Sequence, residues 1–566
     1  MIFSDLQQRY ASGTTPQEII EEIYQKVLTH DDPAIFIHLP EKSELLSLAA
    51  EVAKLPRDLP LWGIPFVVKD NIDVAGWPTT AACPAFSHTP ENDAEVVRLL
   101  REAGAIPLGK TNLDQFATGL VGTRSPYGVP RNVIAPDHLP GGSSSGSASA
   151  VAAGFCPFAL GTDTAGSGRV PAAFQELIGW KPTRGLLSNR GLVPACRSLD
   201  CISVFATNAS DAAAIAKVVS KFDPLDAFAR PVEARGTIGR TFRFGVPRDL
   251  DFENDPDTPA LYAAAIAKLK SLGGTPVEID LTPFTEAALL LYQGPWVAER
   301  WAAVGEFVKK NPDAIFPVTK TILESSQGWD ATATFKAQYQ LREYARQAEA
   351  VWEEIDFLLL PTTPRLYTVA ENLADPIATN SVLGRYTNFM NLLDLSAVAV
   401  PAGRARNGKV PWGVTLAAPA GRDAALLEFA EEFEPTVGIP LAVCGAHLQG
   451  LALHHQLVER NAVFREATTT SASYRLFAMP ASGSIPPRPA LIHDSENGSE
   501  ISVEVWELTP AAFGDFVSKI PAPLGIGKVT LAGGEQVPGF IAEPRAVDGA
   551  EEITRHGGWR AWLATK

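Results

Sequence analysis

Two short loops of this chain carry side chains whose types and order could support nucleophilic catalysis. PGGSSSGSASA, at 140–150, places three consecutive serines, Ser143 to Ser145, before a run of small residues. GTDTAGSGR, at 161–169, follows an apolar run and offers successive backbone N–H groups around Ser167. Fixed N–H donors of this kind can hold the negative charge of a tetrahedral intermediate, so the second loop is typical of an oxyanion hole.

A catalytic serine also needs a base, because its hydroxyl is a weak nucleophile until its proton is removed. Neither loop contains a histidine, although distance in sequence does not exclude a Ser-His-Asp triad. A buried lysine is an alternative base, because burial disfavours its charged form and lowers its pKa.

The loop at 140–150 has other interpretations. Its composition is typical of a flexible linker, but apolar segments flank it on both sides. A phosphate-binding P-loop requires a lysine and a hydroxyl residue after its second glycine, and no lysine follows here. Ser144 or Ser145 could also cap the helix predicted over SASAVAAG, because a serine oxygen accepts a free backbone N–H at that position.

Alternating helices and strands along residues 1–465 must position these loops. ENDAEVVRLLREAG and TPALYAAAIAKLKSLGG have helical spacing. Apolar strands are predicted in LWGIPFVVKD, AIPLGK, FCPFALGTD, TPVEIDL, DFLLLPTTP and SAVAVPAG. The alternation predicts an α/β fold for this domain.

The pattern changes near residue 465. GAHLQGLALHHQLVERNAVF has the spacing of an amphipathic helix that would close the first domain, and the polar segment 466–473 predicts a linker. The remainder, 474–566, combines β-like alternation in ISVEVWEL with many prolines and glycines. We therefore expect a small second domain, rich in β-structure, over 474–566.

The composition limits the partners and the location. The 566 residues are 46% hydrophobic and 20% charged, and no stretch approaches the ~18 apolar residues of a membrane span. The 48 basic and 64 acidic side chains argue against nucleic acid, and an anionic substrate would need a local cationic group. The N-terminus lacks the features of a signal peptide, and five scattered cysteines suit a reducing cytoplasm. The nine histidines show no metal-binding pattern.

Taken together, the motifs resemble the amidase signature family of serine hydrolases, whose mark is a Lys–cis-Ser–Ser triad. GIPFVVKDNIDVAG matches the lysine segment, GGSSSGS the bridging-serine loop, and GTDTAGSGRVPAAF the nucleophile loop, in that order. The match places the base at Lys69, the bridging serine at Ser143 and the nucleophile at Ser167, with the family's spacing of 24 residues between the serines. KTNLDQFA and GWKPTRG match too, so the resemblance covers most of 60–205 and extends loosely to about 460.

The resemblance implies an amidase-signature fold, with a large mixed β-sheet flanked by helices, and a reaction without metal or other cofactor. Ser167 would attack an amide carbonyl, while Ser143 passes the proton to neutral Lys69 and later returns it to the leaving amine. The oxyanion hole would be formed by the backbone N–H groups of Thr164, Ala165, Gly166 and Ser167. Asp163 and Arg169 would support this loop through hydrogen bonds and an ion pair.

A second segment, LLLYQGPWVAERWAAVGEFV, bears on the substrate. It predicts a helix interrupted at Gly294–Pro295, because proline removes a helical hydrogen bond and favours the first turn of a new helix. Tyr292 precedes the break and Arg300 follows it, so a phenol and a guanidinium could face one pocket, and a guanidinium suits a carboxylate. A surface arginine on an amphipathic helix is the alternative.

LYQGPWVAER and RGLVPACRSLDCISVFA resemble the allophanate hydrolases of this family. There the matching tyrosine and arginine bind the carboxylate of allophanate (urea-1-carboxylate), and the backbone near Gly119 lines the same pocket. The products would be ammonia and N-carboxycarbamate, which goes on to carbon dioxide and a second ammonia. The resemblance also implies a homodimer and a functional link to biotin-dependent urea carboxylase in urea or cyanurate breakdown.

The C-terminal domain resembles the small domain of allophanate hydrolases, which is related in fold to gamma-glutamyl cyclotransferases. Some members are thought to process the first product there, and an assembly or stabilising role is the alternative. His493, Glu504 and Glu543 are available polar residues, but their spacing fixes no role.

Three residues depart from the family pattern, and three alternatives stay open. Gln175-Glu176 stand where two asparagines are expected, and Trp180 stands where leucine is expected, which puts the packing around the loop in doubt. The alternatives are an amidase for another small amide such as a malonamate-like substrate, a glutaminase-type subunit of a tRNA-dependent amidotransferase, and an inactive scaffold. Tyr292, Arg300 and the extra domain speak against the second, and the three filled triad positions speak against the third.

Overall fold

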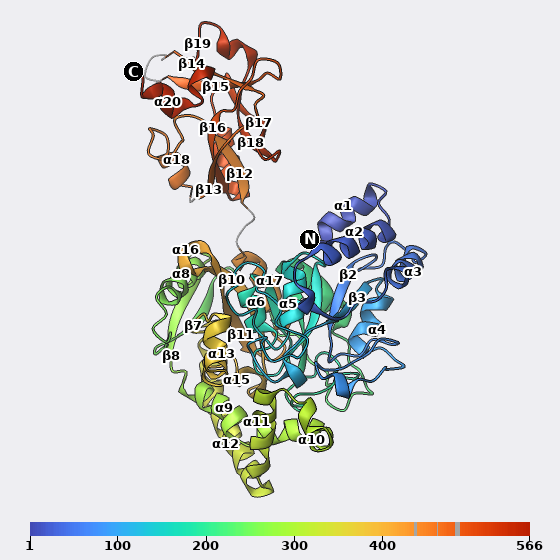
Figure 1. Ribbon diagram of the computed structural model, residues 1–566. Coiled ribbons are helices and arrows are strands. Elements are labelled where there is room, and N and C mark those ends of the chain that lie inside the picture. The colour runs from blue at the N-terminus through green and yellow to red at the C-terminus, as the bar shows by residue number, and fades with distance from the viewer. Residues whose placement is uncertain (435–437, 461, 481–486) are drawn as a thin grey trace. The chain divides into compact units, whose positions relative to one another are not determined.

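The computed structural model describes residues 1–434, 438–460, 462–480 and 487–566 (Figure 1). The chain forms two compact units, Met1–Glu434 and Pro435–Lys566. No helix within these described ranges is both long and apolar enough to cross a membrane.

The boundary between the units therefore lies earlier than the predicted one at 465. The segment predicted as a closing helix contains one short helix, α18 (His455–Val458), and it belongs to the second unit. The predicted linker 466–473 lies largely within a strand, β13 (Val463–Thr469). Its run of threonines is polar, but threonine is β-branched and suits a pleated strand, and this preference outweighs the polarity on which the linker prediction rests.

The first unit is built on one mixed sheet of 11 strands, which agrees with the predicted α/β fold. In spatial order the strands are β1 (Phe36–His38), β3 (Ile106–Thr111), β2 (Pro65–Lys69), β4 (Phe158–Asp163), β6 (Cys201–Ala206), β5 (Ile178–Lys181), β10 (Leu395–Arg404), β11 (Val410–Pro419), β9 (Phe357–Pro361), β7 (Phe242–Pro247) and β8 (Gly274–Ile279). β2 runs parallel to β3 and β4, whereas β6 runs antiparallel to β4 and β5.

The central strands are apolar on both faces because helices cover the sheet on both sides (Figure 1). Every residue of β2, β4, β5 and β6 is buried. Phe66 of β2 stacks on Phe158 of β4 with ring centroids 5.1 Å apart, which fixes the register of the two strands that carry the site. The covering helices include α1 (Phe3–Ala11), α2 (Pro16–Thr29), α3 (Lys42–Ala53), α4 (Glu95–Glu102), α5 (Ser145–Ala152), α6 (Arg169–Phe174), α7 (Ala209–Val219), α8 (Thr258–Ser271) and α17 (Asp423–Phe433).

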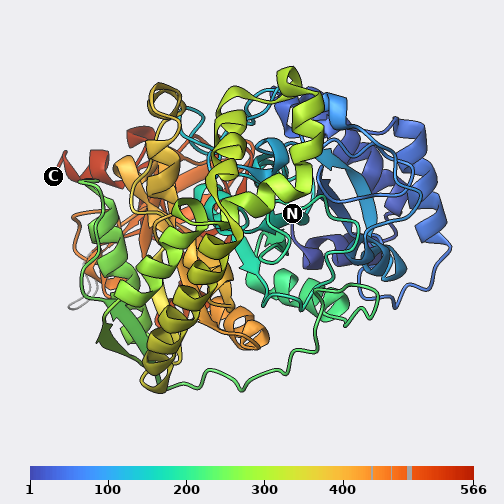
Figure 2. The same ribbon diagram turned by 90° about the horizontal axis from the view of Figure 1, so that it is seen from below.

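A group of helices is inserted between β8 and β9 and gathers at one end of this unit, coloured yellow-green in Figures 1 and 2. These helices are α9 (Thr282–Gln293), α10 (Trp296–Lys310), α11 (Pro317–Ser325) and α12 (Ala331–Glu349). α9 ends and α10 begins on either side of Gly294 and Pro295, so the predicted helix break is confirmed. Shorter helices lie between β9 and β11: α13 (Val369–Ala374), α14 (Ala378–Leu383), α15 (Phe389–Leu392) and α16 (Ala405–Gly408).

The second unit is rich in β-structure, as predicted. Its larger sheet has the order β13, β16 (Ser502–Leu508), β12 (Ile439–Val443), β18 (Gln536–Ala542) and β17 (Leu524–Thr530). Its smaller sheet has the order β15 (Arg488–His493), β14 (Tyr474–Met479) and β19 (Glu551–Glu552). Two further helices, α19 (Pro510–Ser518) and α20 (Trp559–Leu563), complete the unit. It has its own apolar core, in which Leu441, Val505 and Val537 are fully buried.

Candidate active site

The candidate site lies at the carboxyl ends of two neighbouring parallel strands. Lys69 is the last residue of β2, and β4 ends at Asp163, where the loop that carries Ser167 begins. Because parallel strands end at the same edge of a sheet, this topology alone brings the lysine and the loop together. Ser143 immediately precedes the N-cap residue of α5, a helix that packs on β4.

Lys69 and Ser143 are in direct contact. The Lys69 nitrogen lies 2.8 Å from Ser143 Oγ and 2.6 Å from Thr162 Oγ1, and all three side chains are buried. The peptide bond between Gly142 and Ser143 is cis, as expected from the resemblance, and Ser143 faces inward. Burial lowers the pKa of Lys69 to about 7, although nearby carboxylates, Asp114 foremost, act in the opposite direction. A neutral amine that can accept a proton is therefore available near pH 7.

Ser167 lies at the same site, but its hydroxyl has a different partner. Ser167 is 3% exposed, and its Oγ lies 3.4 Å from the carbonyl oxygen of Gly119, at the long limit for a hydrogen bond. Within the described residues, no hydrogen bond joins Ser167 to Ser143. The structure thus brings Lys69 and Ser143 together and places Ser167 against the Gly119 backbone.

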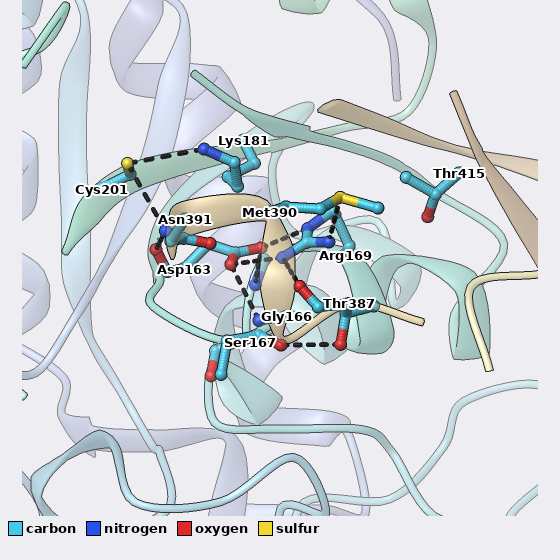
Figure 3. A network of polar contacts seen from close by, with 12 residues as sticks. Asp163, Gly166, Ser167, Arg169, Lys181, Cys201, Thr387, Met390, Asn391 and Thr415 are labelled. Atoms are coloured by element: carbon cyan, nitrogen blue, oxygen red, sulfur yellow. Dashed lines mark hydrogen bonds and ion pairs between the residues drawn. The ribbon is translucent and has the colours of Figure 1, made fainter. Parts of the chain in front are cut away.

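The nucleophile loop is held by a buried ion pair, shown in Figure 3. Arg169 Nε and Nη2 bind the Asp163 carboxylate at 2.8 and 2.9 Å, and both residues are fully buried. Burial alone would raise the pKa of Asp163, but the Arg169 charge holds it below its ordinary value. The same carboxylate accepts the N–H groups of Gly166 at 2.8 Å and Gly168 at 3.1 Å.

One part of the predicted oxyanion hole therefore differs from the structure. The Gly166 N–H is already donated to Asp163, so it does not face an incoming oxyanion. The N–H groups of Thr164, Ala165 and Ser167 have no acceptor among the residues that the structure describes. Within those residues, three of the four predicted donors are therefore free to bind an oxyanion.

Two further residues, Thr387 and Asn391, support the nucleophile loop from behind, and the sequence gives no sign of them. Thr387 Oγ1 donates to the carbonyl oxygen of Ala165 at 2.7 Å, and Asn391 Nδ2 donates to that of Asp163 at 2.7 Å (Figure 3). These two residues lie more than 200 positions after the loop and carry no motif of their own. They fix backbone carbonyls, which any residue can supply, so no sequence signal points to them.

The predicted helix cap is wrong. Ser144 occupies the N-cap position of α5 without capping it; its hydroxyl instead donates to the carbonyl oxygen of Thr162 at 3.2 Å. Ser145 Oγ has no partner among the described residues. The serines are buried against β4, so Ser144 bonds to that strand and leaves the helix end uncapped.

Arg300 and Tyr292 meet beside this loop. Arg300 is 3% exposed, its Nη1 donates to Thr118 Oγ1 at 3.1 Å, and its Nη2 donates to Tyr292 Oη at 3.3 Å. The guanidinium carbon lies 5.6 Å from the centre of the Tyr292 ring. No carboxylate in the described part of the chain forms an ion pair with Arg300. Arg300 is a buried cation, so the alternative of a surface arginine is wrong.

The backbone at 117–119 links the two halves of the site. Gly119 contacts Ser167, and its neighbour Thr118 contacts Arg300. Asp114 holds this turn, because its carboxylate accepts the N–H groups of Gly122 at 3.0 Å and Arg124 at 2.9 Å. A Cβ at Gly119 would lie 2.5 Å from Asp114 Oδ2, so a larger residue there would displace the Asp114 carboxylate. Sequence reasoning missed Asp114, although KTNLDQFA is one of the matching segments.

The residues that depart from the family pattern are each accommodated away from the triad. Gln175 Oε1 accepts the N–H of Val133 at 3.0 Å, and Trp180 Nε1 donates to Asp423 at 3.2 Å. Glu176 pairs with Arg404 at the surface. The doubt about packing around the loop is thereby resolved.

The polar residues singled out in the second unit have separate structural partners. Glu504 accepts hydrogen bonds from Gln449 N and Arg560 Nη2, both at 2.8 Å. Glu543 pairs with Arg545 at 2.6 Å, and the His493 ring packs edge-on against Tyr474. Across the described ranges, no group of three or more histidine, cysteine, aspartate or glutamate side chains is arranged to hold a metal ion. All five cysteines are buried free thiols.

Two family models match the chain. Residues 18–427 match the family described as Amidase, and residues 439–564 match the family described as Allophanate hydrolase C-terminal domain. The two matches fall within the two structural units.

Individual relatives agree with these matches. A solved structure of Kluyveromyces lactis allophanate hydrolase is 39% identical with a TM-score of 0.73, covering 99% of this chain and 98% of its own. The urea amidolyase of Saccharomyces cerevisiae is 43% identical over 89% of this chain, which spans 30% of the length of that relative. A glutamyl-tRNA(Gln) amidotransferase subunit from Thermus thermophilus is 33% identical over 79% of this chain and 98% of its own.

Proposed function

The chain belongs to the amidase family, and we propose that within this family it hydrolyses allophanate to ammonia and carbon dioxide. Two independent features support this substrate. The likeness to the Kluyveromyces lactis allophanate hydrolase extends through both units of the chain. The site also contains a buried arginine that lacks an anion.

The observation that most directly supports this substrate is that Arg300 is buried and has no carboxylate partner among the described residues. A buried guanidinium without a carboxylate partner is costly, because desolvation of its charge is not offset by an opposite charge. Allophanate has a carboxylate at one end and an amide at the other. With the carboxylate on Arg300 and Tyr292, the amide would extend past the 117–119 backbone toward Ser167.

The proposed reaction begins with Ser167 in a rotamer that hydrogen-bonds to Ser143. Ser167 Oγ attacks the amide carbonyl carbon, its proton passes to Ser143, and the Ser143 proton passes to the neutral amine of Lys69. The developing oxyanion would be bound by the N–H groups of Thr164, Ala165 and Ser167. The relay in reverse then protonates the leaving nitrogen, and ammonia departs.

The acyl-enzyme is then a carbamate ester of Ser167 that still carries the substrate's carboxylate. Water activated by the same relay attacks this ester and releases N-carboxycarbamate and free Ser167. N-carboxycarbamate goes on to carbon dioxide and a second ammonia. That last step falls either to the second unit of the chain or to solvent.

Ammonia release tests the proposal. We expect the purified chain to release ammonia from allophanate much faster than from malonamate or from a neutral amide of similar size. Ser167→Ala should abolish release, whereas Ser471→Ala, in the second unit, is a matched serine control expected to retain it. Equal rates on malonamate and allophanate would contradict the substrate assignment.

A glutaminase-type amidotransferase subunit is a second candidate, because the Thermus thermophilus protein matches this chain over 98% of its own length. Glutamine carries an α-carboxylate that suits Arg300, but also a positive α-amino group, which the same cation disfavours. Glutamine hydrolysis by the chain, combined with inactivity on allophanate, would favour this candidate.

The biological setting completes the proposal. We infer a cytoplasmic homodimer that works with a urea carboxylase activity, on the basis of the resemblance of both units to allophanate hydrolases. The oligomeric state is measurable by light scattering of the purified chain, and a monomer at micromolar concentration would contradict the dimer.

A further inference from the structure

Asp200 is a buried carboxylate that the proposed triad does not use. It lies between Leu199 and the first residue of β6, and it is 4% exposed. Thr164 Oγ1 donates to its Oδ1 at 2.5 Å, and the N–H of Ala195 donates to its Oδ2 at 2.9 Å. The N–H of Cys196 lies 3.1 Å from both oxygens. One carboxylate thus joins the segment before β6 to the nucleophile loop.

The Thr164 contact completes a set of anchors, each on a different part of the loop. Asp163, itself paired with Arg169, accepts the Gly166 and Gly168 N–H groups, and Thr387 donates to the Ala165 carbonyl. Thr164 is held through its side chain alone, which leaves its N–H free for an oxyanion. Without Asp200, no described group would fix this first residue of the loop.

Asp200 also acts on the base through space. Its charge raises the pKa of Lys69, as do those of Asp114 and Asp163, while the Arg300 charge lowers it. Burial raises the pKa of Asp200 itself to about 6, opposed by the Thr164 and Cys196 hydrogen bonds and by Arg300. At pH 8 Asp200 is therefore ionised and can accept from all of its donors.

We propose that Asp200 is a positioning residue for amide hydrolysis: its carboxylate holds Thr164 so that the nucleophile loop presents a fixed donor to the transition state. This inference rests on the proposed function. It predicts that loss of the contact lowers the rate of acylation and leaves substrate binding nearly unchanged, because the Arg300 pocket is untouched.

The test compares four variants of the full chain. Asp200→Asn and Thr164→Val remove or weaken the contact, and Thr164→Ser keeps the hydroxyl. Asp423→Asn is a matched control, because Asp423 is also buried and accepts Thr183 Oγ1 at 2.6 Å and Thr183 N at 2.8 Å, away from the loop. We expect kcat on allophanate to fall about tenfold to a hundredfold in the first two variants, with KM changed less than about threefold. Asp423→Asn should retain kcat, and Thr164→Ser should be faster than Thr164→Val because it restores the hydroxyl that donates to Asp200.

Two further readouts separate positioning from folding. The double variant Asp200→Asn, Thr164→Val should be no slower than the slower single variant, because both remove one contact. In Asp200→Asn the acid limb of the kcat/KM profile should move to lower pH, since loss of the charge lowers the pKa of Lys69. Multiplying effects in the double variant, or unchanged kcat in Asp200→Asn, would overturn the inference.

The rate at which a fluorophosphonate labels Ser167 keeps this test independent of the substrate. Phosphonylation uses the same nucleophile and oxyanion donors but no carboxylate. If wild type is inactive on allophanate yet labels rapidly, the proposed substrate fails and the Asp200 inference is still tested by slower labelling of Asp200→Asn. Labelling at the wild-type rate in that variant would refute the inference alone.

Discussion

The Lys69 nitrogen lies closer to Thr162 Oγ1, at 2.6 Å, than to Ser143 Oγ, at 2.8 Å. A neutral amine has two N–H donors and one lone pair. When one N–H is donated to Thr162, the lone pair is free to accept the Ser143 proton. Thr162 would thus orient the proposed base, although it is not a member of the proposed triad.

Replacing Thr162 with valine should therefore impair proton transfer without removing any triad member. We expect kcat to fall about tenfold or more, because the amine loses its fixed orientation. Thr162→Ser, which keeps the hydroxyl, is the control and should retain most activity. Steady-state kinetics of both variants on allophanate make the comparison, and full activity in Thr162→Val would show that Lys69 needs no second partner.

Activity should depend on pH through Lys69. Because burial lowers the pKa of this lysine to about 7, its neutral, proton-accepting form predominates above that pH. We expect kcat/KM to be high at pH 8 and to fall about tenfold for each unit below pH 6. A pH profile in buffers of constant ionic strength measures this limb, and a profile that stays flat from pH 8 to 5 would argue against a neutral lysine base.

Removing the Arg300 guanidinium should discriminate between charged and neutral substrates. Arg300→Ala is expected to reduce kcat/KM on allophanate about a hundredfold or more, because the variant cannot form the buried charge pair with the substrate carboxylate. A neutral amide makes no such pair, so its slow turnover should change little. Tyr292→Phe, which removes the phenol hydroxyl but keeps the ring, should have a smaller effect. Unchanged allophanate kinetics in Arg300→Ala would mean that the carboxylate binds elsewhere.

The buried pair of Asp163 and Arg169 should matter for folding more than any surface pair. Asp163→Asn leaves Arg169 charged and unpaired, at an expected cost of about 3–5 kcal/mol in the free energy of unfolding. Glu176→Gln removes the exposed pair with Arg404 and should cost less than about 1 kcal/mol. Denaturant titrations of the two variants provide the measurement.

The pH dependence of that stabilisation has a definite sign. The folded pKa of Asp163 is lower than its unfolded value, so the stabilisation is present above about pH 4 and is lost as pH falls through the folded value. Asp163→Asn should lose this part of the acid sensitivity. If Asp163→Asn and Glu176→Gln had equal free energies of unfolding at neutral pH, the buried pair would not have the stabilising role assigned to it.

The strands that carry the site could be predicted because their signals are local. LWGIPFVVKD and FCPFALGTD are continuous apolar runs that end at Lys69 and Asp163, as buried parallel strands do. The helix break at Gly294 and Pro295 is equally visible, since proline acts on its own neighbours.

The contacts that complete the site could not be predicted, because they are made across long distances by common residue types. Thr387 and Asn391 reach the loop from the segment after β9, and Thr164 meets Asp200 across 36 positions. The predicted domain boundary differs from the observed one for a related reason. Apolar residues in GAHLQGLALHHQLVERNAVF recur at helical intervals, but residues 445–454 form turns, with Gly450 at a positive φ, and Ile439–Val443 pairs with distant strands.

The helices between β8 and β9 have a consequence for how such enzymes diversify. The residues proposed to break the bond all come from 69–167, at the end of β2 or in loops next to β4 and α5, whereas Tyr292 and Arg300 come from the helices inserted between β8 and β9. The residues proposed for bond cleavage and those proposed for substrate selection thus lie in separate segments of the chain. Replacement of α9 and α10 during evolution could change the amide substrate and leave the catalytic residues intact. Protein engineers could graft the same pair of helices for that purpose.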